Sequence, residues 1–345
     1  VDRNALLDIE NKIKPNYMSQ KKQNTKRKLS LRSWVVLAMW SITFIGIAAV
    51  VTLFALAKNE ILGPMPSFEE LENPKSNLAT EIYGDNGHVI GTFFVQNRSY
   101  VQYEELFPQD SSRHITLDGY DVPPVVAALI ATEDERFRSH SGIDIPSLFR
   151  VGIKTIALRD HSQGGGSTIT QQLAKNLFPR DTVRDRSKVG RTMKLVQSKF
   201  KEWITAIKLE HNYTKEEIAA MYLNTVSYGS NAYGIKSAAS TFFGKNPNEL
   251  NIQEAAMLVG VVNAPTRYSP VRNPESALAR RNLVLSRMRV AGAFSRSVCD
   301  SLSALPITLQ YKPISHNEGE ATYFREMLRN VMNAQRPTRR QFLTD

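Results

Sequence analysis

A run of 25 residues without a single charge, residues 33–57, constrains this 345-residue chain more than any other feature. As an α-helix it would cross the apolar core of a bilayer, which takes about 20 residues. Nine Lys and Arg against three Asp and Glu precede the run, whereas four glutamates lie between residues 60 and 72. Positive flanks stay in the cytoplasm. We therefore predict a basic cytoplasmic tail at 1–32, a single-pass transmembrane helix at 33–57 and the remainder outside.

A cleaved signal peptide is the rival interpretation of the same run. Ala55 and Ala57 have the small-x-small spacing of a cleavage site. The apolar core of a signal peptide is about 7 to 15 residues long. The greater length of this run favours an uncleaved anchor.

Charge and cysteine content narrow the classes of partner. The formal charge is +11, of which the tail supplies +6, and the rest shows no basic run with interleaved aromatic residues. We therefore expect no nucleic-acid partner, whereas an anionic lipid or phosphate substrate fits. The single cysteine, Cys299, excludes an intrachain disulfide and a cysteine-based metal site. The six histidines lack an HExxH pairing, so no metal site is certain.

The remaining pattern is mainly helical after a short connector. We predict a connector at 58–120 with two strands around a turn at 85–87, since Asp-Asn-Gly is a hairpin signal. The apolar segment 145–158 is either a buried core helix or a helix lying in the lipid interface. Caps, prolines and apolar periodicity predict helices at 125–132, 167–177, around 193–207, 214–223, 251–262 and 273–290.

Two polar clusters stand out. Glu133 ends an apolar helix, and it is either a shielded general base or an ordinary surface charge. Three glycines at 164–166 precede Ser167 and Thr168, which allows an anion to approach the first amides of the next helix. The alternative is a flexible turn with a serine N-cap. Lys175 would lie about two turns along that helix.

Lys199 and Glu202 form a third candidate pair. They are three residues apart on a predicted helix and would point to one side. Glu202 supplies a second carboxylate and Lys199 a cation, unless the two form a surface ion pair worth a few tenths of a kcal/mol.

Five motifs in this order resemble the family 51 peptidoglycan glycosyltransferases, found as the glycosyltransferase domain of class A penicillin-binding proteins or as monofunctional relatives. They are Glu133-Asp134 with Phe137, His140 and Gly142; Gly165 to Gln172; Lys199-x-x-Glu202; Tyr222-Leu223-Asn224 with Tyr228-Gly229; and Ala238-Ala239 to Phe243-Gly244-Lys245. The resemblance covers roughly residues 121–290. It implies a mainly α, lysozyme-like, two-lobed helical domain at the outer face of the cytoplasmic (inner) membrane.

The resemblance also implies the chemistry. Such enzymes polymerise lipid II into β-1,4-linked glycan strands, inverting at C1 of the donor MurNAc and releasing undecaprenyl pyrophosphate. It assigns Glu133 as the base for the acceptor hydroxyl and Glu202 to the leaving-group side. Implied partners are lipid II, the growing glycan strand, the membrane and other cell-wall synthesis proteins. No cofactor is obligatory, although Mg²⁺ or Mn²⁺ at the pyrophosphate would fit. The implied substrate-binding residues are Asp134, Phe137, His140, Gly166, Ser167, Thr168, Thr170, Gln171, Gln172, Lys175, Lys199 and Asn224.

Other features qualify the resemblance. Ser198 stands where the family usually has Arg, which removes a cation near the donor phosphates. Transpeptidase motifs occur in no credible setting, yet 318–334 resembles the linker that precedes a transpeptidase. We therefore predict that 291–345 leads towards a missing C-terminal domain, and favour a piece of a bifunctional protein over a monofunctional enzyme. A lytic enzyme that cleaves peptidoglycan and a non-catalytic membrane scaffold remain the alternatives.

Overall fold

A computed structural model describes residues 30–58, 80–83, 89–93, 97–98, 100–150, 166–178 and 187–313, together with residues 323, 324, 327 and 331. The chain divides into two compact units, Val1–Asn59 and Glu60–Asp345. Nearly all of the predicted tail 1–32 and about half of the predicted C-terminal linker 291–345 lie outside the described residues.

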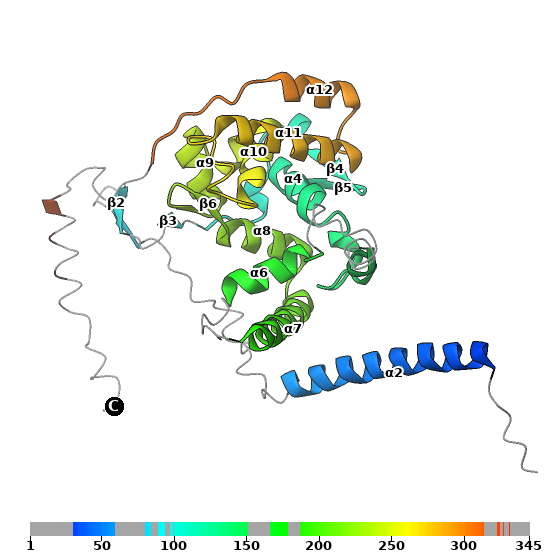
Figure 1. The fold of residues 1–345 in the computed structure, drawn as a ribbon. Coiled ribbons are helices and arrows are strands. Elements are labelled where there is room, and N and C mark those ends of the chain that lie inside the picture. Colours follow the sequence, from blue (N-terminus) through cyan, green and yellow to red (C-terminus); the bar gives the residue numbers. More distant parts are fainter. Residues whose placement is uncertain are drawn as a thin grey trace, which may run out of the picture. The chain divides into compact units, whose positions relative to one another are not determined.

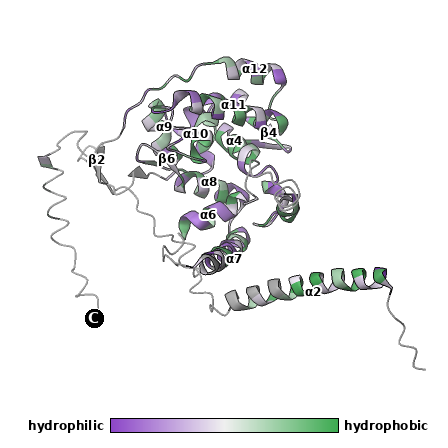
Figure 2. Ribbon diagram, viewed as in Figure 1, coloured by the Kyte–Doolittle hydropathy of each residue, from purple (hydrophilic) through white to green (hydrophobic). Residues whose placement is uncertain are grey.

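The first unit contains one long apolar helix, α2 (Leu31–Lys58). It includes the range predicted at 33–57 and is largely apolar (Figure 2). Trp34 and Trp40 are both exposed. Its segment Leu31–Ala48 is long and apolar enough to cross a membrane by length and composition. A signal sequence near an N-terminus would pass the same test, so the anchor stays a prediction.

The second unit is mainly helical, which confirms the predicted fold class (Figure 1). Helices within its described residues include α4 (Pro124–Glu133), α6 (Ile169–Leu177), α7 (Lys188–Asn212), α8 (Lys215–Thr225), α9 (Ile235–Phe243), α10 (Ile252–Val262), α11 (Pro274–Val290) and α12 (Arg296–Ala304). The part of this unit that the structure describes also contains the short 3₁₀ turns η1 (Glu104–Leu106), η2 (Ser111–Arg113), η3 (Phe137–Ser139) and η4 (Pro247–Glu249).

Short strands complete the unit. The predicted hairpin is confirmed, because β1 (Thr80–Tyr83) pairs antiparallel with β2 (Val89–Phe93). Among the described residues, β4 (Ile115–Leu117) pairs antiparallel with β5 (Tyr120–Val122). The strand β7 (Ala232–Tyr233) pairs antiparallel with β6 (Ser227–Gly229) and parallel with β3 (Asn97–Arg98).

Local capping explains where several helices begin. The Thr214 hydroxyl and the Glu217 carboxylate form a reciprocal capping box at α8, and Asn251 with Glu254 does the same at α10. Pro274 opens α11, where its missing N–H costs no hydrogen bond. These three starts agree with the predicted ones.

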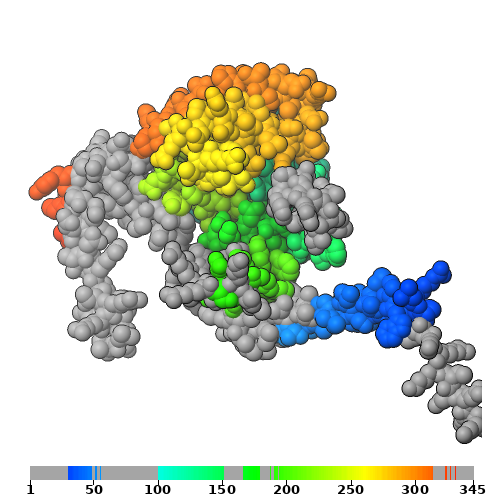
Figure 3. All heavy atoms as spheres, in the orientation of Figure 1, coloured from blue at the N-terminus to red at the C-terminus, as the bar shows by residue number. Residues whose placement is uncertain are grey.

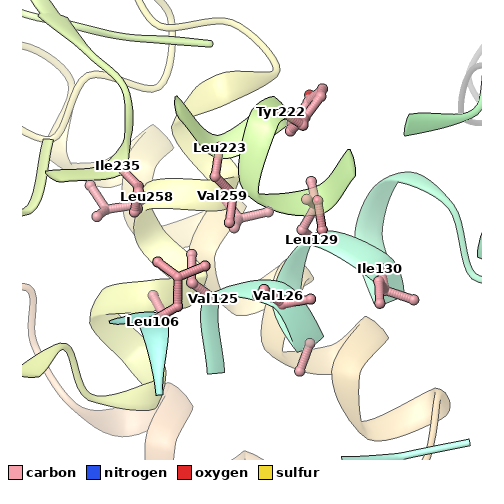
Figure 4. Close-up of a cluster of buried hydrophobic side chains, with 14 of the residues drawn as sticks. Leu106, Val125, Val126, Leu129, Ile130, Tyr222, Leu223, Ile235, Leu258 and Val259 are labelled. Atoms are coloured by element: carbon pink, nitrogen blue, oxygen red, sulfur yellow. The ribbon is translucent and has the colours of Figure 1, made fainter. Parts of the chain in front are cut away.

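Two groups of helices meet around one hydrophobic core. α4 packs against α10 and α11, whereas α6 packs against α7 and α8. α4 is buried from Pro124 to Thr132, and Leu129 and Ile130 lie in the core with Tyr222 of α8 nearby (Figure 4). Burying each such aliphatic side chain contributes about 1.5–3 kcal/mol. Because α4 is buried along almost its whole length, the backbone of its last residue, Glu133, is held in a fixed position.

The core extends beyond the range predicted for the globular domain. Val101, Leu106 and Ile115, assigned to the connector by the sequence, are buried members of it. Cys299 of α12, beyond residue 290, is buried there as well. The boundaries of a domain are set by core packing, whereas the range 121–290 was predicted from local sequence pattern. That range therefore leaves out residues that belong to the core.

The apolar segment predicted at 145–158 is described only to residue 150. It is helical from residue 145, and Ile145 and Phe149 are 59% and 69% exposed. The described part is therefore not a buried core helix, while residues 151–158 lie outside the described residues.

Candidate active site

Glu133 is the last residue of α4 and is held from a second helix. Gln172 Nε2 of α6 donates to Glu133 Oε2 at 3.0 Å, and Tyr222 Oη of α8 donates to Gln172 Oε1 at 3.0 Å. Burial, and the negative charge of Glu133, raise the pKa of the Tyr222 phenol, so this hydroxyl stays protonated and remains a donor. The Glu133 side chain keeps 15% of its surface exposed. It is supported on one side and open on another.

Arg280 of α11 is a neighbour of Glu133 that the sequence analysis missed. Its Nη2 atom lies 3.9 Å from Glu133 Oε1, and its side chain is 13% exposed. At that separation the two charges attract each other, but they form no direct hydrogen bond that would occupy Glu133 Oε1. The only sequence signal was a basic residue on the helix predicted at 273–290, and nothing local connects that position with Glu133.

Asp134 is turned inward and bonded on both sides. Its carboxylate accepts from His140 Nε2 at 3.1 Å and from the Ile169 amide at 3.0 Å. The Gly142 amide donates to His140 Nδ1, which therefore carries no proton, and Nε2–H is the donor to Asp134. Asp134 thus supplies a negative charge at the start of α6, where the helix dipole favours it.

The start of α6 differs from the predicted one. Its N-cap is Thr168, whose hydroxyl accepts from the Gln171 amide at 3.2 Å, and not Ser167. With Ile169 bonded to Asp134, two amides of the first turn are already used. The backbone that remains accessible to an external anion is therefore the stretch of Gly166 and Ser167 before the helix, and both residues are half-buried.

Gly142 joins this region to α7. Its carbonyl accepts from Thr168 Oγ1 at 2.7 Å and from Gln171 Nε2 at 3.0 Å. Its φ is +87°, and a Cβ added there would lie 2.9 Å from the backbone carbon of Ala206. Both the backbone conformation and the close approach to α7 require glycine here.

We expect Gly142→Ala to lower the free energy of unfolding by about 2–5 kcal/mol. The left-handed conformation accounts for about 1–2 kcal/mol and the clash with Ala206 for about 1–3 kcal/mol. Gly292→Ala is the matched control, since its φ is +88° with nothing within 4 Å of an added Cβ. Denaturant midpoints of the two variants measure the difference, and equal losses would contradict the role given to the contact.

A buried ion pair ties α6, α7 and α8 together. Thr170 Oγ1 donates to Glu210 Oε1, and Lys215 Nζ lies 2.7 Å from Glu210 Oε2. The same ammonium donates to the His140 carbonyl and lies 4.4 Å from the centroid of the buried Phe137 ring. Thr170 and Phe137 therefore belong to the support of the site in this conformation.

The second predicted carboxylate is also buried. Glu202 is 5% exposed and its Oε2 lies 2.7 Å from Lys199 Nζ, whose side chain is 41% exposed. Lys199 Nζ also donates to Ser167 Oγ at 3.1 Å. Since Glu202 is buried, the two are not a plain surface ion pair. Gln172 bonds Glu133 directly, and Ser167 is linked to Glu202 through Lys199. Because Ser167 and Gln172 are five residues apart, one segment shorter than two helical turns connects the two carboxylates.

The structure separates two other predicted site residues from these clusters. Both polar atoms of the Asn224 side chain pair with the backbone of Val101, at 3.1 and 2.8 Å. Asn224 thereby fastens the N-terminal part of the core to α8. Lys175 is exposed on α6, one turn beyond Gln172.

No part of the chain that the structure describes gathers three or more His, Cys, Asp or Glu side chains as a metal site requires. Near the predicted donor side, Glu202 offers one carboxylate whose Oε2 lies 2.7 Å from Lys199 Nζ. These residues do not fit a metal ion held by the protein alone.

A helical domain that holds one partly exposed carboxylate on a buried polar support can serve group transfer, and comparison with known proteins gives the class. A family model described as "Transglycosylase" matches residues 87–289. The chain therefore belongs to the transglycosylase family, the family 51 glycosyltransferases that its ordered motifs resemble.

Curated relatives agree with this assignment. Penicillin-binding protein 1A of Aquifex aeolicus is 36% identical over 272 residues, covering 77% of this chain and 34% of the relative. The proteins of the same name from Pseudomonas aeruginosa and Neisseria flavescens are 31% and 35% identical, covering 85% and 86% of this chain and 32% of each relative. The chain thus spans about a third of the length of these relatives.

Proposed function

We propose that this chain is a peptidoglycan glycosyltransferase that polymerises lipid II into β-1,4-linked glycan strands. The observation that carries the proposal is Glu133, a partly exposed carboxylate fixed by Gln172 and flanked by Arg280. A member of the transglycosylase family needs one such group to activate an acceptor hydroxyl.

In the proposed reaction Glu133 takes the proton from the 4-hydroxyl of the acceptor GlcNAc. The hydroxyl oxygen attacks C1 of the donor MurNAc from the face opposite the leaving group, so the configuration inverts. The bond from C1 to undecaprenyl pyrophosphate breaks, and its electron pair leaves with the pyrophosphate. Because a pyrophosphate leaves without being protonated, no second acid is needed, unlike glycoside hydrolysis.

The donor side requires positive charge to offset the pyrophosphate. Lys199 is half-exposed and held by Glu202 and Ser167, and Lys175 is exposed on α6. We assign the pyrophosphate to these two cations and to the stretch of Gly166 and Ser167. Glu202 acts there by holding Lys199.

Burial divides the predicted substrate-binding residues into two groups. Those with accessible surface, which we assign to substrate contact, are Gly166, Ser167, Gln172, Lys175 and Lys199. Those that are buried or bonded internally, which we assign to positioning, are Asp134, Phe137, His140, Thr168, Thr170, Gln171 and Asn224. A divalent cation would depend on the oxygens of the pyrophosphate, and no step is assigned to it.

The substitution Ser198→Arg is expected to restore a cation beside Lys199. We predict that it tightens binding of a phosphoglycolipid mimic of the donor by about tenfold, as one additional charge-assisted contact contributes about 1.5 kcal/mol. Titration calorimetry would measure this, with Ser198→Gln as the uncharged control. An unchanged dissociation constant would refute the idea that the serine weakens donor binding.

A lipid-linked substrate accounts for the apolar helix. We propose that α2 anchors the chain in the cytoplasmic membrane with its N-terminus inside, and that exposed Ile145 and Phe149 contact the outer leaflet. Tethering confines enzyme and substrate to one plane, which raises their effective concentration. Cell-wall synthesis proteins are the partners proposed for such an enzyme.

Labelled lipid II separates the proposal from its alternatives. Polymer formation by the wild-type chain supports the transferase. Shortening of preformed glycan strands without polymer would instead indicate a lytic enzyme, and turnover of neither substrate would indicate a scaffold. The products can be resolved by gel electrophoresis and by mass spectrometry of released fragments.

A further inference from the structure

A pocket of about 170 Å³ opens between the start of α10, α11 and the segment that follows α12. Its lining includes Asn251, the N-cap of α10, with Gln253 and Glu254 of α10, Arg281 of α11 and residues 306–308. The elements around it belong to the yellow and orange part of the surface (Figure 3). Since one water needs about 10–15 Å³ on this measure, there is room for roughly ten waters or a small ligand.

Arg281 is the unusual member of this lining, because only 1% of it is exposed. Its Nε and Nη2 atoms donate to Asn282 Oδ1, and Nη2 also reaches the carbonyls of Ser303 and Leu305 at the end of α12. Among the described residues, Nη1 has no hydrogen-bond partner and no carboxylate lies within 4.0 Å of the guanidinium. Buried charges in proteins are normally paired.

The start of α10 adds donors to the same pocket. The Asn251 side chain serves the Glu254 amide, which leaves the Ile252 and Gln253 amides without an intrahelical partner. Glu254 is a carboxylate in the lining, but both of its oxygens accept from Lys245 Nζ, at 2.8 and 2.9 Å. Its charge is balanced by Lys245, so among the described residues no carboxylate of the lining is left to pair with Arg281.

We propose that this pocket binds a small oxyanion, a carboxylate or a phosphate group, through Arg281 Nη1 and the first amides of α10. Capping of α12 explains the contacts of Nη2, but it explains neither the unused Nη1 nor the pocket beside it. A bound anion would connect α10 and α11 with residues 306–308, and would thereby stabilise the packing of the segment that leaves α12.

The test uses the full chain in detergent, with thermal unfolding followed in sodium chloride, sodium phosphate or sodium acetate at equal ionic strength. Gln253→Glu places a carboxylate in the lining at a helix start, where the dipole favours it, so this variant is expected to fold. Gln102→Glu makes the same charge change at an exposed position outside the pocket lining.

We expect phosphate or acetate to raise the melting temperature of the wild type and of Gln102→Glu above the value in chloride. Gln253→Glu should lose this response, and calorimetry should show at least about tenfold weaker binding of the same anion, since like charges repel at short range. A response to acetate alone assigns a carboxylate ligand, a response to phosphate alone a phosphate, and a response to both a general oxyanion site. An equal response of Gln253→Glu, or no response of the wild type, would overturn the proposal, and neither result depends on glycosyl transfer.

Discussion

Replacing Glu133 by Gln is expected to lower kcat for lipid II polymerisation by about 10²- to 10⁴-fold, the range for loss of a general base. The amide cannot take the acceptor proton. It has the size of the carboxylate and can still accept from Gln172 Nε2, so the fold should be retained. Initial rates with labelled lipid II, measured at saturating substrate, give the change in kcat.

Glu135→Gln is the matched control for this experiment. Glu135 lies two residues after Glu133 and its side chain is exposed, so this substitution removes the same charge from a position open to solvent. Its rate should stay within a factor of about two of wild type, because an exposed charge contributes little. If Glu133→Gln retained more than a tenth of the wild-type rate, Glu133 would not be the base.

Removing the Asp134 carboxylate is expected to have a large effect on stability. Asp134→Ala leaves two buried donors, His140 Nε2–H and the Ile169 amide, without their acceptor. Each unsatisfied donor costs about 1–3 kcal/mol. We therefore expect a loss of about 2–6 kcal/mol, which for a domain of this size lowers Tm by about 4–24 °C.

Two variants test the reason for this loss. Asp300→Ala removes a 72% exposed carboxylate whose nearest cation, Arg296, lies at 3.8 Å, and it should change stability by less than about 0.5 kcal/mol. Asp134→Asn keeps one oxygen acceptor and should fall between wild type and Asp134→Ala. Thermal unfolding measures these differences. If Asp134→Ala unfolded at the wild-type Tm, the Asp134 contacts would not be needed to hold α6.

Local signals predicted much of the helical framework. The capping residues Thr214 and Asn251 and the dipeptide Asn273–Pro274 act within a few residues of their own helices, so the sequence alone locates these starts. By contrast, α9 and α12 were not predicted. Their docking depends on contacts with distant elements, as when the Gln310 amide bonds the Phe242 carbonyl at the end of α9.

The sequence drew attention to several residues that the structure places in contact, but it could not indicate which of them are buried. The order of motifs brought Glu133, Gln172 and Lys199 to notice, and Arg280 escaped because its neighbour is distant in sequence. Burial determines which of the candidate residues are accessible to a substrate. Asn224 shows this, since the same polar side chain that suits a sugar hydroxyl is used to clasp the backbone of Val101.

The inward carboxylate at the start of α6 has a consequence for turnover. A polymerase that releases a pyrophosphate at every cycle must let that product go, and binding it as tightly as the incoming donor would slow each round. An open helix end would hold both alike. Because Asp134 already occupies this one, we expect the spent carrier of the proposed reaction to be held mainly by Lys199 and Lys175, which have accessible surface, and to depart when the new bond has formed.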